Sequence, residues 1–256
     1  MPDQVQFAVS EGIATLTLNR PEKLNAVTAP MQQALARAVE HCNADDNVRC
    51  VILTGAGERA FCAGSDIGAL DGYETPWALR HRVDYCDILR RLRKPALAAV
   101  NGFALGGGLE AALACDVRIA ADSAQFAAPE IKLGWIGGGG MVASLTRAIG
   151  SSNAALMVLT GDVISADQAL RWGLVSQVVP LPELLPASRR IAATIASRAP
   201  IAAEIAKLNF KAAFSMPFAQ AVEYERDLQT ICFGTEDAAE GRAAFKEKRP
   251  PRFRRR

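Results

Sequence analysis

A run of three glycines, Gly106 to Gly108, followed by Glu110, is the segment whose residue types are best suited to chemistry. The apolar stretch 96–100 precedes it as an expected buried strand, and a helical pattern starts at Leu109. Glycine lets the backbone approach a ligand closely, and free amides at a helix start carry partial positive charge. Such a corner can stabilise an oxyanion. The alternative is a tight strand-to-helix turn in which glycine is needed only for steric reasons.

A second acidic residue, Glu130, follows Pro129 within the apolar stretch 124–134. An unpaired carboxylate in such a setting is costly unless it has a partner or a role. Glu130 is therefore a candidate for acid–base chemistry. The alternative is a solvated loop carboxylate, since glutamates usually lie at the surface.

Three other constellations are excluded by their spacing. His41 and His81 fall in helical patterns without partner ligands, so we expect no metal site. The segment 64–68 places its serine one position too early for a nucleophile elbow. The segment 55–60 fits the loose dinucleotide fingerprint, but the glycines and small residues of 61–68 do not suit the helix that a pyrophosphate requires. We therefore expect no nicotinamide cofactor.

Alternating strands and helices are expected to position these residues. Apolar alternation on both sides of Ser10-Glu11-Gly12 predicts a hairpin, and short apolar or β-branched runs predict buried strands. Strand, helix and further strand together favour repeated ββα units. The expected elements are a hairpin at 7–18, strands at 51–54, 96–100 and 117–120, a helix from Thr28 to Cys42, a helix from Leu79 to Leu92, and a capped short helix from Ser165 to Gly173.

The pattern becomes entirely helical after Pro180, which predicts a boundary. We expect a mixed α/β core over residues 1–182 and a helical region over residues 183–256. With 256 residues, half of them apolar, the chain is long enough for one main domain with a small appendage.

Charge and cysteine usage limit the setting in which the protein works. The formal charge of +2 is too small to attract the whole protein to nucleic acid or to an anionic membrane. The six cysteines form no CxxC pairs and indicate a reducing compartment. The first residues lack the features of a signal peptide, and no run of about 18 uninterrupted apolar residues is present. We expect a soluble cytoplasmic protein without a membrane partner.

Several segments in fixed order resemble the enoyl-CoA hydratase/isomerase (crotonase) superfamily over nearly the whole chain. Each segment alone is weak evidence, but their order and spacing together are specific. The matching segments are 18–21, 24–26, 60–67, 106–110 with Cys115-Asp116, Phe126 with Pro129-Glu130, 159–161, 173–175, and 235–237 with Glu240-Gly241.

The resemblance implies a crotonase-like spiral of ββα units with a C-terminal helical region that forms homotrimers or dimers of trimers. It implies an acyl-CoA thioester as substrate and no separate cofactor, because coenzyme A is part of that substrate. The Ser65 and Gly107 amides would hold the thioester oxygen. Glu110 would orient and activate water, and Glu130 would deliver the α-proton, so we expect an enoyl-CoA hydratase. Further binding positions implied by the resemblance are Lys23, Leu24, Ala63, Asp66 and Ile67.

The segment after Glu130 departs from the family pattern. Many hydratases have Thr-Ile-Pro-Gly where this chain has Trp135-Ile136-Gly137-Gly138. Gly138 still matches the family glycine near the catalytic water, and Trp135 either reshapes the acyl pocket or is a core aromatic residue.

Other functions stay open. The nearest alternative is another superfamily reaction on a CoA thioester: double-bond isomerisation, a hydratase-lyase reaction or hydrolysis. A catalytically idle CoA-binding scaffold is a further one. A more remote alternative is an RNA-binding hydratase homologue, suggested by the basic tail, whose simpler interpretation is a solvated chain end. The arginines concerned are Arg249, Arg252, Arg254, Arg255 and Arg256.

Overall fold

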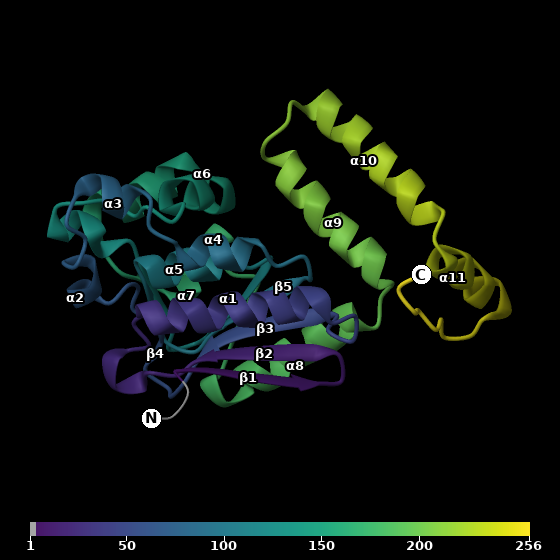
Figure 1. Cartoon of the computed structure of the whole chain (residues 1–256), viewed down its shortest axis with the longest axis horizontal. Coiled ribbons are helices and arrows are strands. Elements are labelled where there is room, and N and C mark those ends of the chain that lie inside the picture. The colour runs from purple at the N-terminus through teal and green to yellow at the C-terminus, as the bar shows by residue number, and fades with distance from the viewer. Residues whose placement is uncertain (1–3) are drawn as a thin grey trace.

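The strands of the chain form two sheets, as seen in the computed structural model, which describes residues 4–256 (Figure 1). Residues 1–3, part of the stretch expected to lack a signal peptide, lie outside the described residues. The six-stranded sheet has the order β1 (Val5–Ser10), β2 (Ile13–Leu18), β3 (Cys50–Gly55), β5 (Ala96–Val100), β7 (Val117–Ala121) and β10 (Gln177–Val179). The four-stranded sheet has the order β4 (Ala60–Cys62), β6 (Phe103–Leu105), β8 (Gln125–Ala127) and β9 (Ile164–Ser165).

Three times along the chain, a strand of the six-stranded sheet is followed by a strand of the four-stranded sheet and then by a helix. β3 leads to β4, β5 to β6, and β7 to β8, and these strands pair in parallel within their sheets. This arrangement confirms the predicted ββα repeat. The predicted hairpin is confirmed too: β1 and β2 pair antiparallel, and Glu11 and Gly12 both have positive φ, as a two-residue hairpin turn requires.

Seven helices belong to residues 29–172, and the predicted amphipathic helix is among them. It begins where expected, because the Thr28 hydroxyl accepts a hydrogen bond from the Met31 amide and caps the first turn. Its apolar face, including Leu35 and Val39, is buried. These helices are α1 (Ala29–Ala44), α2 (Ile67–Leu70), α3 (Pro76–Arg80), α4 (Tyr85–Arg90), α5 (Gly107–Leu113), α6 (Met141–Thr160) and α7 (Ala166–Trp172).

The single helix predicted from Leu79 to Leu92 is wrong. The structure divides it into α3 and α4. The Asp84 carboxylate accepts a hydrogen bond from the Cys86 amide and starts a new helix there. The apolar spacing continues across the break, so periodicity alone does not detect it.

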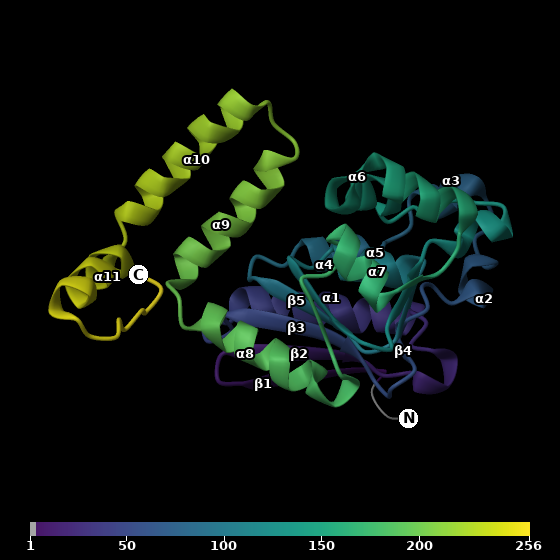
Figure 2. The same cartoon turned by 180° about the vertical axis from the view of Figure 1, so that it is seen from behind.

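Four helices follow the last strand: α8 (Leu184–Ala196), α9 (Pro200–Ala213), α10 (Phe218–Phe233) and α11 (Glu236–Glu247). α8 packs across β2, β3, β5 and β7, and its apolar face is buried in the core. α9 and α10 lie side by side and project from the body with α11 (Figures 1 and 2). A boundary at residue 182 remains a prediction, and the projecting part starts after α8.

Among residues 4–256, α6 is the helix whose length and composition would suit a membrane span. Gly150 leaves the helical region at its middle, with φ 78° and ψ 162°. Each half therefore has about ten residues and spans about 15 Å, half of a typical hydrocarbon core of about 30 Å. α6 is thus two short helices joined at a kink.

Candidate active site

A cavity of about 450 Å³ opens between the segment after β4, the start of α5 and the loop after Glu130. Eight of the eleven residues predicted for the site line it: Ala63, Ser65, Ile67, Gly107, Glu110, Glu130, Trp135 and Gly138. The three others, Lys23, Leu24 and Asp66, are not among its lining residues. Two other cavities, of about 800 and 490 Å³, lie at the C-terminal tail and against α9. Neither Glu110 nor Glu130 lines them.

The backbone at Ser65 and Gly107 offers two hydrogen-bond donors. Gly107 is the first residue of α5, so its amide has no partner within the helix. Ser65 forms a parallel β-bridge with Val27. The Val27 amide donates a hydrogen bond to the Gly64 carbonyl, and the Asp66 amide donates one to the Val27 carbonyl. Within residues 4–256, neither the Ser65 nor the Gly107 N–H donates a hydrogen bond.

Glycines bring these two amides together. A Cβ at Gly64, which has φ +101°, would lie 3.2 Å from the Gly107 nitrogen. Gly106, with φ 54° and ψ −127°, turns the chain from β6 into α5 in a conformation that favours glycine. The binding of a ligand oxygen by these two amides stays a prediction.

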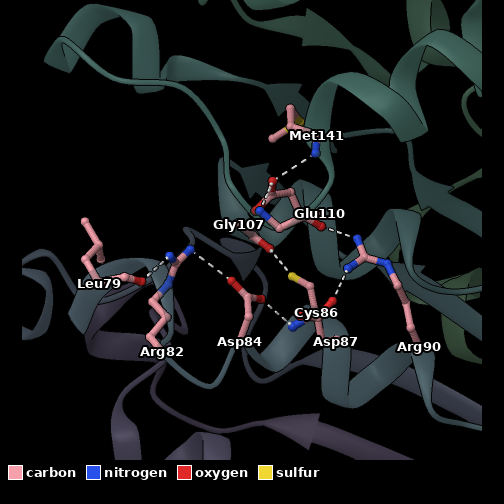
Figure 3. Close-up of polar contacts among 10 residues, drawn as sticks. Leu79, Arg82, Asp84, Cys86, Asp87, Arg90, Gly107, Glu110 and Met141 are labelled. Atoms are coloured by element: carbon pink, nitrogen blue, oxygen red, sulfur yellow. Dashed lines mark hydrogen bonds and ion pairs between the residues drawn. The ribbon is translucent and has the colours of Figure 1, made fainter. Parts of the chain in front are cut away.

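Glu110 lies on α5 and joins it to the start of α6. Its Oε1 accepts a hydrogen bond from the Gly139 amide at 2.8 Å. It accepts a second one from the Met141 amide at 3.0 Å (Figure 3). The pKa of Glu110 is raised to about 7, mainly by burial and further by the negative charges of Asp84 and Glu130. The hydrogen bonds from the Met141 and Gly139 amides lower this pKa but do not cancel the rise. Glu110 can therefore gain or lose a proton near neutral pH.

Glu130 lies on the 3₁₀ turn Pro129–Leu133, against the glycine corner. A Cβ at Gly106 would lie 2.9 Å from its Oε1, so the carboxyl group packs against the residue that precedes Gly107. Its Oε2 is buried and has no hydrogen-bond partner within residues 4–256. Burial raises the pKa of Glu130 above its ordinary value. This buried oxygen therefore has unused hydrogen-bonding capacity beside the cavity.

Charged and polar side chains from the break between α3 and α4 complete the site. Arg82, Asp84 and Tyr85 line the cavity, and Arg82 forms an ion pair of 3.0 Å with Asp84 (Figure 3). Arg90 on α4 donates to the Gly139 carbonyl and so holds the segment that binds Glu110. The sequence alone did not identify these residues as part of the site, because its periodicity predicted one continuous helix from Leu79 to Leu92. The capping aspartate at position 84 was the signal that could have revealed them.

Three predicted positions have structural partners elsewhere. The Asp66 carboxylate accepts from Arg20 at 2.6 Å and caps α2 through the Gly68 amide at 3.1 Å. Lys23 ends the short turn Pro21–Lys23, and Leu24 caps it with a positive φ of 51°. Contact of Lys23, Leu24 and Asp66 with the substrate stays a prediction.

The part of the chain that the structure describes, residues 4–256, holds no cluster of His, Cys, Asp and Glu that could bind a metal ion. The basic tail folds back on α11 instead of extending into solvent. The Arg254 and Arg255 amides donate to Asp237, and the Arg249 side chain pairs with Glu240. The tail is therefore held by carboxylates, and part of its charge is neutralised.

Comparisons with known proteins give one consistent result. The family model described as enoyl-CoA hydratase/isomerase matches residues 8–256. A probable enoyl-CoA hydratase of Mycobacterium tuberculosis is 42% identical over 244 residues, 94% of each chain. An (E)-benzylidenesuccinyl-CoA hydratase of Thauera aromatica is 39% identical over 252 residues, 98% of each chain. The crystal structure of an enoyl-CoA hydratase from Bacillus anthracis superposes with a TM-score of 0.94 at 36% identity, covering 99% of this chain and 100% of the other.

Proposed function

Because the chain belongs to the enoyl-CoA hydratase/isomerase family, we propose that it adds water reversibly to the 2,3 double bond of an enoyl-CoA thioester. The product is a 3-hydroxyacyl-CoA. The observation that carries the proposal is the presence of two buried carboxyl groups, Glu110 and Glu130, in one cavity with two unpaired amides.

The two amides act on the thioester oxygen. When water adds to C3, negative charge moves onto this oxygen and an enolate forms. The fixed N–H groups of Ser65 and Gly107 stabilise the enolate far more than the neutral substrate, which lowers the barrier. Loss of one such donor typically costs about 10²–10³ in rate.

The two carboxyl groups divide the proton transfers. Glu110 accepts the proton of the water whose oxygen bonds to C3, and Glu130 donates a proton to C2 as the enolate collapses. Burial raises both pKa values, so each carboxyl group takes up a proton at a higher pH than an exposed glutamate does. Such a pair suits a reaction that needs one base and one acid.

The presence of both carboxyl groups favours hydration over the alternative reactions of the family. Moving a double bond transfers a proton between two carbons and requires no activated water. Glu110 is held by two backbone amides in a fixed position, which suits the positioning of a water molecule. No cofactor beyond the coenzyme A of the substrate enters the proposal.

A panel of enoyl-CoA thioesters, analysed by mass spectrometry, tests the proposal. It should contain linear and aromatic acyl groups, because Trp135 lines the cavity and one relative is named for an aromatic acyl substrate. The expected product carries one additional water. Unchanged mass with a shifted double bond would support an isomerase, and free coenzyme A would support a hydrolase.

Substitution then assigns the reaction to the site. Glu110→Gln and Glu130→Gln should each lower kcat by about 10³-fold or more while CoA esters still bind. Glu74→Gln, at an exposed position, is the control and should keep full activity. Full activity in either of the first two variants would refute the assigned roles.

We also propose that the protein forms trimers in the cytoplasm. Its C-terminal helices support self-association, because α10 has no buried residue and exposes Phe218 and Ile231. Sedimentation equilibrium should give a multiple of three chains, and a monomer would contradict this part of the proposal.

A further inference from the structure

The hydroxyl group of Tyr85 is a buried polar group whose function the two-glutamate mechanism leaves unexplained. Tyr85 is 3% exposed and lines the active-site cavity. Its hydroxyl oxygen makes no hydrogen bond of full geometry within residues 4–256, although the Ser65 side chain approaches it. Leaving a buried hydroxyl unpaired is costly, so its position calls for a ligand that completes the bond.

The hydroxyl lies at the glycine corner. A Cβ at Gly107 would overlap the Tyr85 oxygen, so this oxygen occupies the space that a side chain at position 107 would need. Ser65, whose amide is the second expected donor, is the other close neighbour, because its side chain acts on the pKa of Tyr85. The hydroxyl therefore lies beside both residues whose amides face the thioester oxygen.

The fold fixes the ring in place. Tyr85 is the first residue of α4, and the Asp84 carboxylate caps this helix through the Cys86 amide at 2.8 Å (Figure 3). α4 packs against α1 and α5, and the Cys86 thiol contacts the Gly107 carbonyl at 3.8 Å. The tyrosine and the glycine corner are thus held by directly contacting elements, which makes the donor preorganised.

The hydroxyl is a proton donor at physiological pH. Burial raises the pKa of Tyr85 well above its ordinary value, and the neighbouring Cys86 and Glu110 add to this while the Ser65 side chain opposes it. A neutral phenol can donate one hydrogen bond.

We propose that Tyr85 is a third donor of the oxyanion hole, whose hydroxyl binds the thioester oxygen together with the Ser65 and Gly107 amides. This inference rests on the proposed function and adds a catalytic residue to it. The hydroxyl stabilises the enolate more than the neutral thioester, so it acts mainly on kcat.

Tyr85→Phe removes the hydroxyl and keeps the ring. We expect kcat for hydration of crotonyl-CoA to fall about 10- to 100-fold, because two donors remain, with KM changed less than about threefold. Thermal stability should change little, since the hydroxyl makes no hydrogen bond of full geometry in the free protein and loses only the approach of the Ser65 side chain. Tyr224→Phe, on the projecting α10, is the control and should match the wild type in all three measurements.

Acetoacetyl-CoA provides a second measurement that does not depend on turnover. Its enolate absorbs in the near ultraviolet, so the pH at which the bound compound ionises reports how strongly the site stabilises an enolate. This pH should be higher in Tyr85→Phe than in the wild type and in Tyr224→Phe.

Three outcomes would overturn the inference. A Tyr85→Phe enzyme with more than half the wild-type kcat and an unchanged ionisation pH would make Tyr85 a packing residue. A clear drop in its melting temperature would show that the hydroxyl has a structural partner. A wild type that neither hydrates enoyl-CoA esters nor ionises the analogue would refute the proposed function and this inference together, whereas the first two results would leave the proposed function intact.

Discussion

Glu110 owes its raised pKa first to burial and then to the negative charges of Asp84 and Glu130. As the proposed base it must be ionised to accept a proton from water. Since kcat/KM reports ionisations of the free enzyme, its value should fall as the pH drops through about 7.

Asp84→Asn should move this acidic limb to lower pH. The substitution removes a negative charge that disfavours ionisation of Glu110, and asparagine can still cap α4. At pH about 6, activity relative to the plateau should rise about two- to fivefold. The pH profile of kcat/KM measures the shift. Asp167→Asn, an exposed change on α7, should leave the profile unchanged, and an unmoved limb in Asp84→Asn would contradict the electrostatic account.

Gly139→Ala should displace the Glu110 carboxylate. The added Cβ would lie 2.6 Å from Glu110 Oε2 and 3.2 Å from the Cys86 sulfur, so the carboxylate must move. A shift of about 1 Å in a catalytic group costs about 10²-fold in rate, and we expect a loss of that size in kcat. Gly72→Ala, whose Cβ meets only a carbonyl oxygen at 3.4 Å, is the control. Equal activity of the two variants would show that Glu110 needs no fixed position.

At this scale, residue type predicted part of the site. Glu110 and the glycine corner stood out because a carboxylate and three glycines at a strand-to-helix junction suggest chemistry on their own. Tyr85 did not, since an aromatic residue within a helical pattern is usually a core residue. Whether its hydroxyl is paired depends on neighbours from other elements, and one sequence does not contain that information.

Several longer elements were predictable, whereas the short strands were not, and α3 and α4 were predicted as a single helix. β3, β5 and β7 follow from apolar runs, and α1 follows from its cap and its apolar face. The strands of the second sheet have two or three residues, too few for a period to show. That sheet carries the turns that lead to the site, so its geometry needed the structure.

An ion pair attaches the projecting α9 to the core. Lys207 Nζ lies 2.8 Å from the Asp116 carboxylate and 3.0 Å from the Lys94 carbonyl oxygen, and the lysine is 4% exposed. Lys207→Met keeps the volume but leaves Asp116 without its cation. We expect a loss of about 3 kcal/mol in the free energy of unfolding.

Urea denaturation measures this loss. Lys246→Met, at an exposed position on α11, should stay within about 0.5 kcal/mol of the wild type. A similarly small change in Lys207→Met would mean that α9 is attached mainly by apolar contacts.

At the scale of the whole molecule, the site depends on residues that are distant in sequence and lie together in one cavity. Ser65 comes from the segment after β4, Gly107 and Glu110 from α5, and Glu130 from the turn after β8. Local pattern identified Glu110, Glu130 and the glycine corner, and the family resemblance added Ser65. The order of strands in the two sheets brings them to one cavity. The family resemblance supplied this topology before the structure did, because it summarises the same long-range arrangement.

A crystal structure of the protein with acetoacetyl-CoA tests the central claim most directly. The account predicts that the thioester oxygen lies within about 3.2 Å of both the Ser65 and the Gly107 nitrogen atoms. It also predicts that C2 and C3 of the acyl group lie between the carboxyl groups of Glu110 and Glu130. A thioester bound outside this cavity, or one with either glutamate out of reach of the reacting carbons, would contradict it.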